Sequence, residues 1–236
     1  MVKKISILLT LCLTASLLFF CTKQVDSSNE LSQGVVEFDI SYPVKNYNSY
    51  MEKLIPKKMT MYFKNNVYKN EVAVGHIFTS SIITDCNNKE MVMMLHLNPE
   101  KIFTRLNERQ VEEMLSKNPT PEIITSNSKD SIIGLVCKRH YGIYDELKDG
   151  RDVQLNETNK INITNSNWNN PYNMINGVLT NYEVERFGLN MQFKASQINT
   201  QKLVSDSTFI IPENYNEVSL DVYLQKMNDI FSTFLN

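Results

Sequence analysis

The side chains that could act as nucleophiles or general bases are dispersed along this chain. Residues 126–129 read S-x-x-K, the spacing in which a lysine can activate a serine hydroxyl, but the S-D-N and K-T-G motifs that accompany it in enzymes are absent. The G-x-S-x-G turn and the H-E-x-x-H pair are absent as well. A four-residue match inside a polar tract arises easily by chance. We therefore expect no enzymatic activity.

Metal binding is not expected either. His76, His96 and His140 are separated by 20 and 44 residues, whereas histidine ligands on one face of a helix lie roughly four residues apart. The acidic residues at 112–113 and between 145 and 152 fall in short-helix and turn contexts, which are typical of a solvated surface. We interpret the histidines as solvated or core residues, and we expect no metal and no cofactor.

The chemistry that the sequence does indicate is a modification of Cys21. Lys3 and Lys4 precede an apolar run at residues 5–20, which is shorter than the roughly 20 residues that a membrane-spanning helix needs. A positively charged start followed by such a run is typical of a secretory signal peptide. The run stops at Cys21, and the residues from 22 to 30 are mostly polar.

This boundary resembles the signal of bacterial lipoproteins. The resemblance implies that residues 1–20 are removed, that Cys21 becomes the first residue with acyl chains on its sulfur, and that residues 21–33 form a flexible tether. Phe19 and Phe20 depart from the small residues that the family places before the cysteine. The alternative is a plain signal or an uncleaved anchor with an incidental cysteine. Two acyl chains suffice for stable membrane anchoring.

The other cysteines fit an exported protein. Cys12 would leave with the signal, so Cys86 and Cys137 would remain as an even pair in an oxidising compartment. A disulfide between them would stabilise the fold by roughly 4 kcal/mol in the chain-entropy model. The alternative is that both are small buried hydrophobic side chains.

Composition and charge narrow the possible partners. Of the 24 basic residues, Lys3 and Lys4 lie in the signal, which has no acidic residue, so 22 basic and 26 acidic side chains remain, a formal charge of −4. This balance argues against nucleic-acid binding. The remaining chain of about 215 residues can bury a large core, and it contains no internal repeat. We predict a single domain over residues 34–236.

Most of this domain has the period-two alternation of half-buried strands. In residues 34–42, for example, Val36, Phe38 and Ile40 alternate with Glu37 and Asp39. The close spacing of such runs predicts an antiparallel meander in a large, strongly curved sheet. The strands are expected at residues 34–42, 59–64, 66–74, 77–86, 90–97, 101–106, 132–144, 178–187, 189–195 and 197–205.

Three helices are predicted between and after these strands. The apolar spacing at 47–55 is helical, and Pro56 ends that helix. A short helix is expected at 108–116. The last helix, at 219–235, has Ser219 as its N-cap and an apolar stripe along one side. Such a stripe must be covered, and a concave sheet face is the obvious partner.

Three segments, at residues 132–140, 171–191 and 206–215, resemble a family of small Gram-negative lipoproteins that are similar in fold to the lipoprotein carriers LolA and LolB. The resemblance implies a mainly β fold with some helix, in which a curved antiparallel half-barrel sheet wraps around a few helices and a cavity accepts acyl chains. The matching positions are Gly134, Cys137, Lys138, Gly177, Leu179, Tyr182, Gly188, Met191, Phe209, Pro212 and Tyr215.

The inward faces of the predicted strands are rich in methionine, whose flexible thioether side chain adapts to irregular apolar shapes. They would provide a deformable lining for a lipid cavity. The alternative is an ordinary core packed against the last helix, because a pocket and a core have the same alternation pattern. The candidate lining residues are Met59, Met61, Phe63, Met91, Met93, Met191 and Phe193.

We therefore expect a lipid-anchored protein of the cell envelope, in the outer membrane of a Gram-negative bacterium. Its ligand would be apolar, either a lipid or the acyl chains of another lipoprotein, bound in the half-barrel cavity. The alternative is an interaction module without a lipid cavity, which holds a partner protein or a glycan on its outer surface. The Asn-rich tract at residues 156–173 is one candidate for that surface.

Overall fold

Within the residues that the computed structural model describes, 30–44, 52, 55–76, 78–144 and 152–235, one large open sheet dominates the fold. The strand order is β12-β6-β5-β4-β3-β2-β1-β11-β10-β9-β8-β7. The strands are β1 (Gln33–Ser41), β2 (Lys58–Lys64), β3 (Val67–Val74), β4 (Phe78–Asp85), β5 (Glu90–Leu97), β6 (Glu100–Asn107), β7 (Glu122–Ile132), β8 (Leu135–Ile143), β9 (Val153–Thr158), β10 (Val178–Arg186), β11 (Leu189–Asn199) and β12 (Asn216–Glu217).

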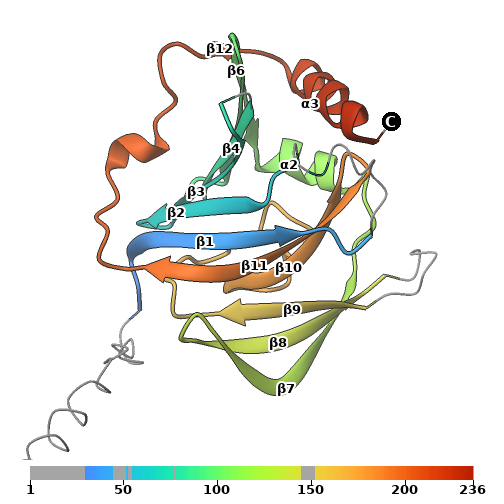
Figure 1. Cartoon of the computed structure of the whole chain (residues 1–236). Coiled ribbons are helices and arrows are strands. Elements are labelled where there is room, and N and C mark those ends of the chain that lie inside the picture. Colours follow the sequence, from blue (N-terminus) through green and yellow to red (C-terminus); the bar gives the residue numbers. More distant parts are fainter. Residues whose placement is uncertain (1–29, 45–51, 53–54, 77, 145–151, 236) are drawn as a thin grey trace, which may run out of the picture.

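The sheet is strongly curved, as the sequence predicts. Figure 1 shows β3, β4 and β6 running in a clearly different direction from β1, β11, β9 and β8. All pairs of adjacent strands are antiparallel except β12 and β6. The curvature gives the sheet an inner and an outer face, and most buried apolar residues lie on the inner face.

Three hairpins have two-residue turns in which both residues have a positive φ angle. The pairs are Asn65–Asn66, Ile133–Gly134 and Phe187–Gly188. This backbone twist matches the right-handed twist of the flanking strands. The turn at 133–134 corrects the start of the strand predicted at 132–144: β7 ends at Ile132, and β8 begins only at Leu135. A β-branched isoleucine with positive φ is uncommon, so the residues at 133–134 do not predict a turn.

The sequence-based prediction also missed two strands and placed one strand wrongly. β7 and β9 were not predicted as strands: β7 is largely exposed and polar, and β9 is buried at nearly every position. Neither has the clear alternation of a half-buried strand, which explains why the pattern did not predict them. Both strands pair with β8. The strand predicted at 197–205 does not form, since β11 ends at Asn199.

Two α-helices follow the predicted pattern. In α2 (Glu108–Leu115), the Asn107 side chain accepts from the Gln110 backbone N–H at 3.1 Å, and the Gln110 side chain accepts from the Asn107 N–H at 3.0 Å. α3 (Leu220–Leu235) begins after Ser219, whose hydroxyl oxygen accepts from the Val222 N–H at 3.4 Å. The helix predicted at 47–55 lies largely outside the described residues.

The inner face is covered from two sides. α3 covers one end, where Tyr223, Met227 and Phe231 are buried against the sheet, and Figure 1 shows this helix above α2 at the mouth of the curve. The loop at residues 159–177 fills the other end, with Ile161 and Trp168 in the core. None of the helices in the described part of the chain is both long enough and apolar enough to cross a membrane.

The Asn-rich tract at 156–173 is partly buried and partly exposed; Asn162 and Asn165, for example, are exposed. Asn156, Asn167 and Asn169 are all buried. The Asn167 amide donates to the Ile175 and Gly177 carbonyls at 2.7 and 2.8 Å. This buried side chain is therefore the hydrogen-bond partner of backbone carbonyls inside the fold. The polarity of these buried asparagines serves hydrogen bonds inside the fold, both within the loop and to β4.

On the outer face, the segment that leaves β11 crosses β4, β5 and β6. It contains the 3-10 helix η2 (Asp206–Phe209) and leads to β12. Phe209, Ile211 and Tyr215 pack there on a small second core. Figure 1 shows this segment rising along the sheet before α3. It shields apolar side chains on the outer face, namely Ile83, Val92, Met94 and Phe103.

Candidate functional site

A cavity of about 170 Å³ lies between α3 and the inner face of the sheet. Side chains from β1 to β5, β10 and β11 form its floor, and Tyr223, Met227 and Phe231 form its roof. The lining is mainly apolar because these strands direct alternate side chains inward. It is a space that α3 and the sheet create together.

Aromatic pairs form much of the wall. Tyr182 stacks on Phe193 with ring centroids 5.0 Å apart. Phe187 stacks on Phe231 at 5.0 Å, and Phe78 meets Phe231 edge to face at 6.3 Å. Such contacts fix ring positions beyond what burial alone provides. The methionines supply the adaptable part of the lining.

The seven residues predicted to line a cavity separate into two groups. Met59, Met93, Met191 and Phe193 do line the space under α3. The other three are packed in the core and line neither of the two cavities described here: Met61, Phe63 and Met91.

Local contacts explain why two of these three side chains are core residues. The Phe63 ring packs so closely on Gly34 that an added Cβ there would lie 3.0 Å from it. The Met91 sulfur accepts from the Asn169 amide at 3.5 Å. The loop at 159–177 therefore occupies the part of the inner face beside Met91.

A larger cavity of about 500 Å³ adjoins the first. It lies among the end of α2, the residues that follow it, the β10–β11 turn, and α3 at Leu224. β9 pairs with β10 only at residues 178–181, so the edge of β10 beyond that point is open to the cavity. The two cavities meet at Met93, Val184, Arg186 and Phe187, which line both.

Arg186 is the charged residue at this junction, and sequence reasoning missed it. Arg186 follows Tyr182 and Val184 at every second position of β10, so it lies on the inward side of the strand. A charged residue at an inward position could have indicated this site from the sequence. Burial lowers the pKa of Arg186 below its ordinary value. Burial also raises the pKa of the neighbouring Tyr223 to about 12, so that phenol is neutral at physiological pH.

Cys86 and Cys137 do not form the disulfide considered as one alternative. Both are free and buried. The Cys137 sulfur lies 3.3 Å from the Thr180 hydroxyl oxygen. Burial raises the pKa of Cys86 to about 12 and raises that of Cys137 as well, so neither thiol is a ready nucleophile.

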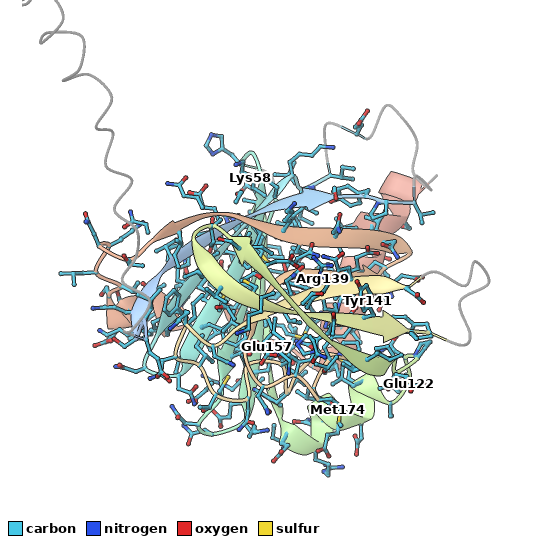
Figure 2. All side chains as sticks on the ribbon, turned by 90° about the horizontal axis from the view of Figure 1, so that it is seen from below. Lys58, Glu122, Arg139, Tyr141, Glu157 and Met174 are labelled. Carbon is cyan, nitrogen blue, oxygen red and sulfur yellow. The ribbon has the colours of Figure 1, made fainter. Side chains whose placement is uncertain are left out.

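His140 is a core residue with partners at both ring nitrogens. Its Nδ1 lies 2.9 Å from the Thr125 hydroxyl, and its Nε2 lies 2.8 Å from Glu157 Oε2. Glu157 Oε1 accepts from the Gly177 backbone N–H at 2.7 Å. Glu157 belongs to β9 and is labelled in Figure 2. The chain of hydroxyl, imidazole and carboxylate has the connectivity of a catalytic triad.

The surroundings of these hydrogen-bonded side chains, Thr125, His140 and Glu157, favour a structural role. Neither of the two cavities described above includes Thr125, His140 or Glu157. The hydrogen bonds instead join β7, β8, β9 and the loop before β10. The neighbouring S-x-x-K stretch is a bulge in which the Ser126 hydroxyl accepts from the Ser128 N–H at 3.1 Å.

Replacing Glu157 with leucine is expected to destabilise the protein. The change leaves His140 Nε2 and the Gly177 N–H without their acceptor, and each such loss costs about 1 to 3 kcal/mol. Chemical denaturation measures the free energy of unfolding. The control is Glu122→Leu at an exposed position of β7 (Figure 2), which should change stability little. Equal stability of Glu157→Leu and wild type would contradict the buried hydrogen-bond chain.

Metal binding has no support in the described part of the chain. No group of three or more histidine, cysteine, aspartate or glutamate side chains there is arranged to hold a metal ion. His76 is exposed and His96 is partly buried, on separate elements from His140.

Comparison with known proteins identifies a shared fold rather than a family. No protein-family model matches the chain, and no curated protein matches it. Solved structures of PNGF-II in the C2 and P21 space groups are similar, with TM-scores of 0.51 and 0.53 at 13% and 12% identity. They match 84% and 85% of this chain but only 33% and 34% of their own length. The chain thus spans about a third of PNGF-II.

Proposed function

We propose that this protein is a lipid-anchored protein of the cell envelope that binds an apolar ligand, either a lipid or the acyl chains of another lipoprotein. The observation that carries the proposal is the apolar cavity enclosed between α3 and the inner face of the sheet, with its methionine and aromatic lining. An open, curved sheet with a helix over its concave side also agrees with a LolA-like half-barrel. The ligand would enter from the larger cavity.

The sizes of the two cavities suggest how an acyl chain would be distributed. Ligand pockets commonly measure about 300 to 1,000 Å³, and the larger cavity, at about 500 Å³, falls in this range. The smaller one, at about 170 Å³, is close to the size of an apolar cavity that accepts one benzene molecule. Part of a chain would therefore lie under α3, and the rest would lie in the larger cavity.

The proposed anchor would hold this cavity close to a membrane. Eleven residues separate Cys21 from Gln33, where β1 begins, and even a fully extended chain of that length spans only about 40 Å. A protein tethered in this way would meet ligands at or near the membrane surface.

The alternative, an interaction module, has less support among the described residues. Part of the Asn-rich tract proposed for its surface is buried, and the exposed large apolar side chains, such as Val44, Met174 and Leu203, lie on separate segments. Single exposed apolar residues are ordinary on protein surfaces. We therefore favour the ligand cavity.

Met93→Trp tests the ligand cavity directly. The chain from residue 21 onward, produced without the signal so that Cys21 carries no acyl chain, should bind the neutral fluorescent probe Nile red, and dodecanol should displace it. Met93 lines both cavities, so the indole is expected to fill the space and abolish probe binding. The melting temperature should change little, because an empty space accepts the added volume.

Met91→Trp is the matched control. Met91 lies two residues away on the same face of β5, but it is packed in the core and lines neither described cavity. Overpacking there is expected to cost about 1 to 3 kcal/mol. If the wild type binds no probe and both tryptophan variants lose stability alike, the methionines are core and the lipid-binding proposal fails.

A further inference from the structure

Arg186 lies where the two cavities meet. It is the last residue of β10, and its register partner on β11 is Leu189. Because Tyr182, Val184 and Arg186 alternate along one strand, the guanidinium shares the inner side with an aromatic and an aliphatic side chain. All three line the cavity under α3.

No described carboxylate lines the cavity under α3 beside this cation. Among the described residues that line the cavity under α3, Arg186 is the only charged one. It forms no hydrogen bond or ion pair with a described residue, whereas Arg109 pairs with Glu113 and Arg139 pairs with Asp130.

The phenols around Arg186 cannot supply that charge. Burial raises the pKa values of Tyr182 and Tyr223, so both phenols are neutral at physiological pH. A phenol in this form can donate a hydrogen bond to an anion but cannot balance a cation.

Arg186 is only partly exposed, and holding its charge partly out of water among apolar and neutral groups opposes folding, because the charge loses hydration without gaining a partner. This loss of hydration is also why the pKa of Arg186 is lowered. A bound anion would remove that penalty. The position of the guanidinium, at the boundary between an apolar cavity and a larger, more open one, would suit the charged end of an amphiphile.

The charges of the larger cavity limit which anion fits. Lys117, Glu183 and Glu185 also line it, so the two carboxylates there oppose any ligand with several negative charges. A single carboxylate carries one charge, and its two oxygens match the planar fork of an arginine. A phosphate would bring more negative charge than one guanidinium balances.

We infer that the ligand is a fatty acid whose carboxylate binds Arg186 and whose apolar chain lies against Met93 and Met191 under α3. The inference rests on the proposed function, because it requires an apolar ligand in this cavity. It adds that the cavity selects a carboxylate over a neutral lipid of the same chain length.

The test compares dodecanoate with dodecanol as competitors for Nile red, on the chain from residue 21 onward. The two competitors have the same chain and differ in charge. Charge-assisted hydrogen bonds predict that dodecanoate displaces the probe at a concentration about 10- to 100-fold lower than dodecanol does. Arg186→Met should remove this difference, because the carboxylate then has no cationic partner in the cavity. Arg109→Met, at an exposed arginine of α2, should preserve it.

Thermal melting provides a second measurement. Arg186→Met removes a charge that has no described partner, so its melting temperature should equal or exceed that of the wild type. A clear decrease would mean that the arginine stabilises the fold, and it would overturn the inference. Equal displacement by dodecanoate and dodecanol in the wild type would also overturn it, while leaving the proposed function intact. Failure of Nile red and both competitors to bind would reject both proposals.

Discussion

Replacing Phe231 with alanine is expected to lower the free energy of unfolding by about 3 to 5 kcal/mol, the usual cost of deleting a buried aromatic side chain. Phe231 is 5% exposed. It stacks on Phe187 and meets Phe78 edge to face, so its loss removes contacts with both the β10–β11 turn and β4. Since domains are commonly stable by only about 5 to 15 kcal/mol, this loss is a large share. Denaturant titration gives the value.

Val222→Ala on the same helix is the control. Val222 is 42% exposed, so its truncation removes little buried area and should leave the unfolding curve almost unchanged. If Phe231→Ala unfolds at the same denaturant concentration as the wild type, α3 does not stabilise the sheet. The roof of the cavity would then be absent, and the ligand proposal would lose its main support.

Replacing Cys21 with serine is expected to release the protein from the membrane. The change removes the thiol that would carry the acyl chains, each of which contributes about 0.8 kcal/mol per buried methylene. Cys21 lies outside the described residues, so this prediction rests on the boundary between the apolar run and the polar tract. Cell fractionation followed by immunoblotting measures the distribution between membrane and soluble fractions.

Cys12→Ser provides the matched control for the anchor. Cys12 lies inside the apolar run, where a thiol would be removed with the signal, so this variant should stay in the membrane fraction. Recovery of Cys21→Ser in the membrane pellet in the absence of detergent would contradict lipidation at that residue.

The local pattern of apolar and polar residues was sufficient to predict much of the sheet. The alternation is strict in β2 and clear in the second half of β1, because one face of each is buried and the other is more exposed. The stripe on α3 was equally clear from its spacing. For these elements, the side that faces the core could be predicted from sequence because neighbouring residues alternate or repeat with a fixed period.

Elements whose burial depends on distant residues were not predictable in this way. β9 is buried at five of its six positions because β8, β10 and the loop at 159–177 surround it. The asparagines of that loop look solvated in sequence, yet they supply hydrogen bonds inside the core. Polarity in sequence indicates contact with water only if the fold leaves the residue exposed.

The same distinction between local pattern and long-range packing applies to the candidate site. The sequence by itself determined that Met59, Met93, Met191 and Phe193 face inward, since strand periodicity decides the side of the sheet. Only the tertiary structure decided that these residues border a space while Met91 is packed, because α3 and the loop at 159–177 reach the sheet from positions far away along the chain. The same long-range packing places Arg186 at the junction of the two cavities, so its environment depends on the whole fold.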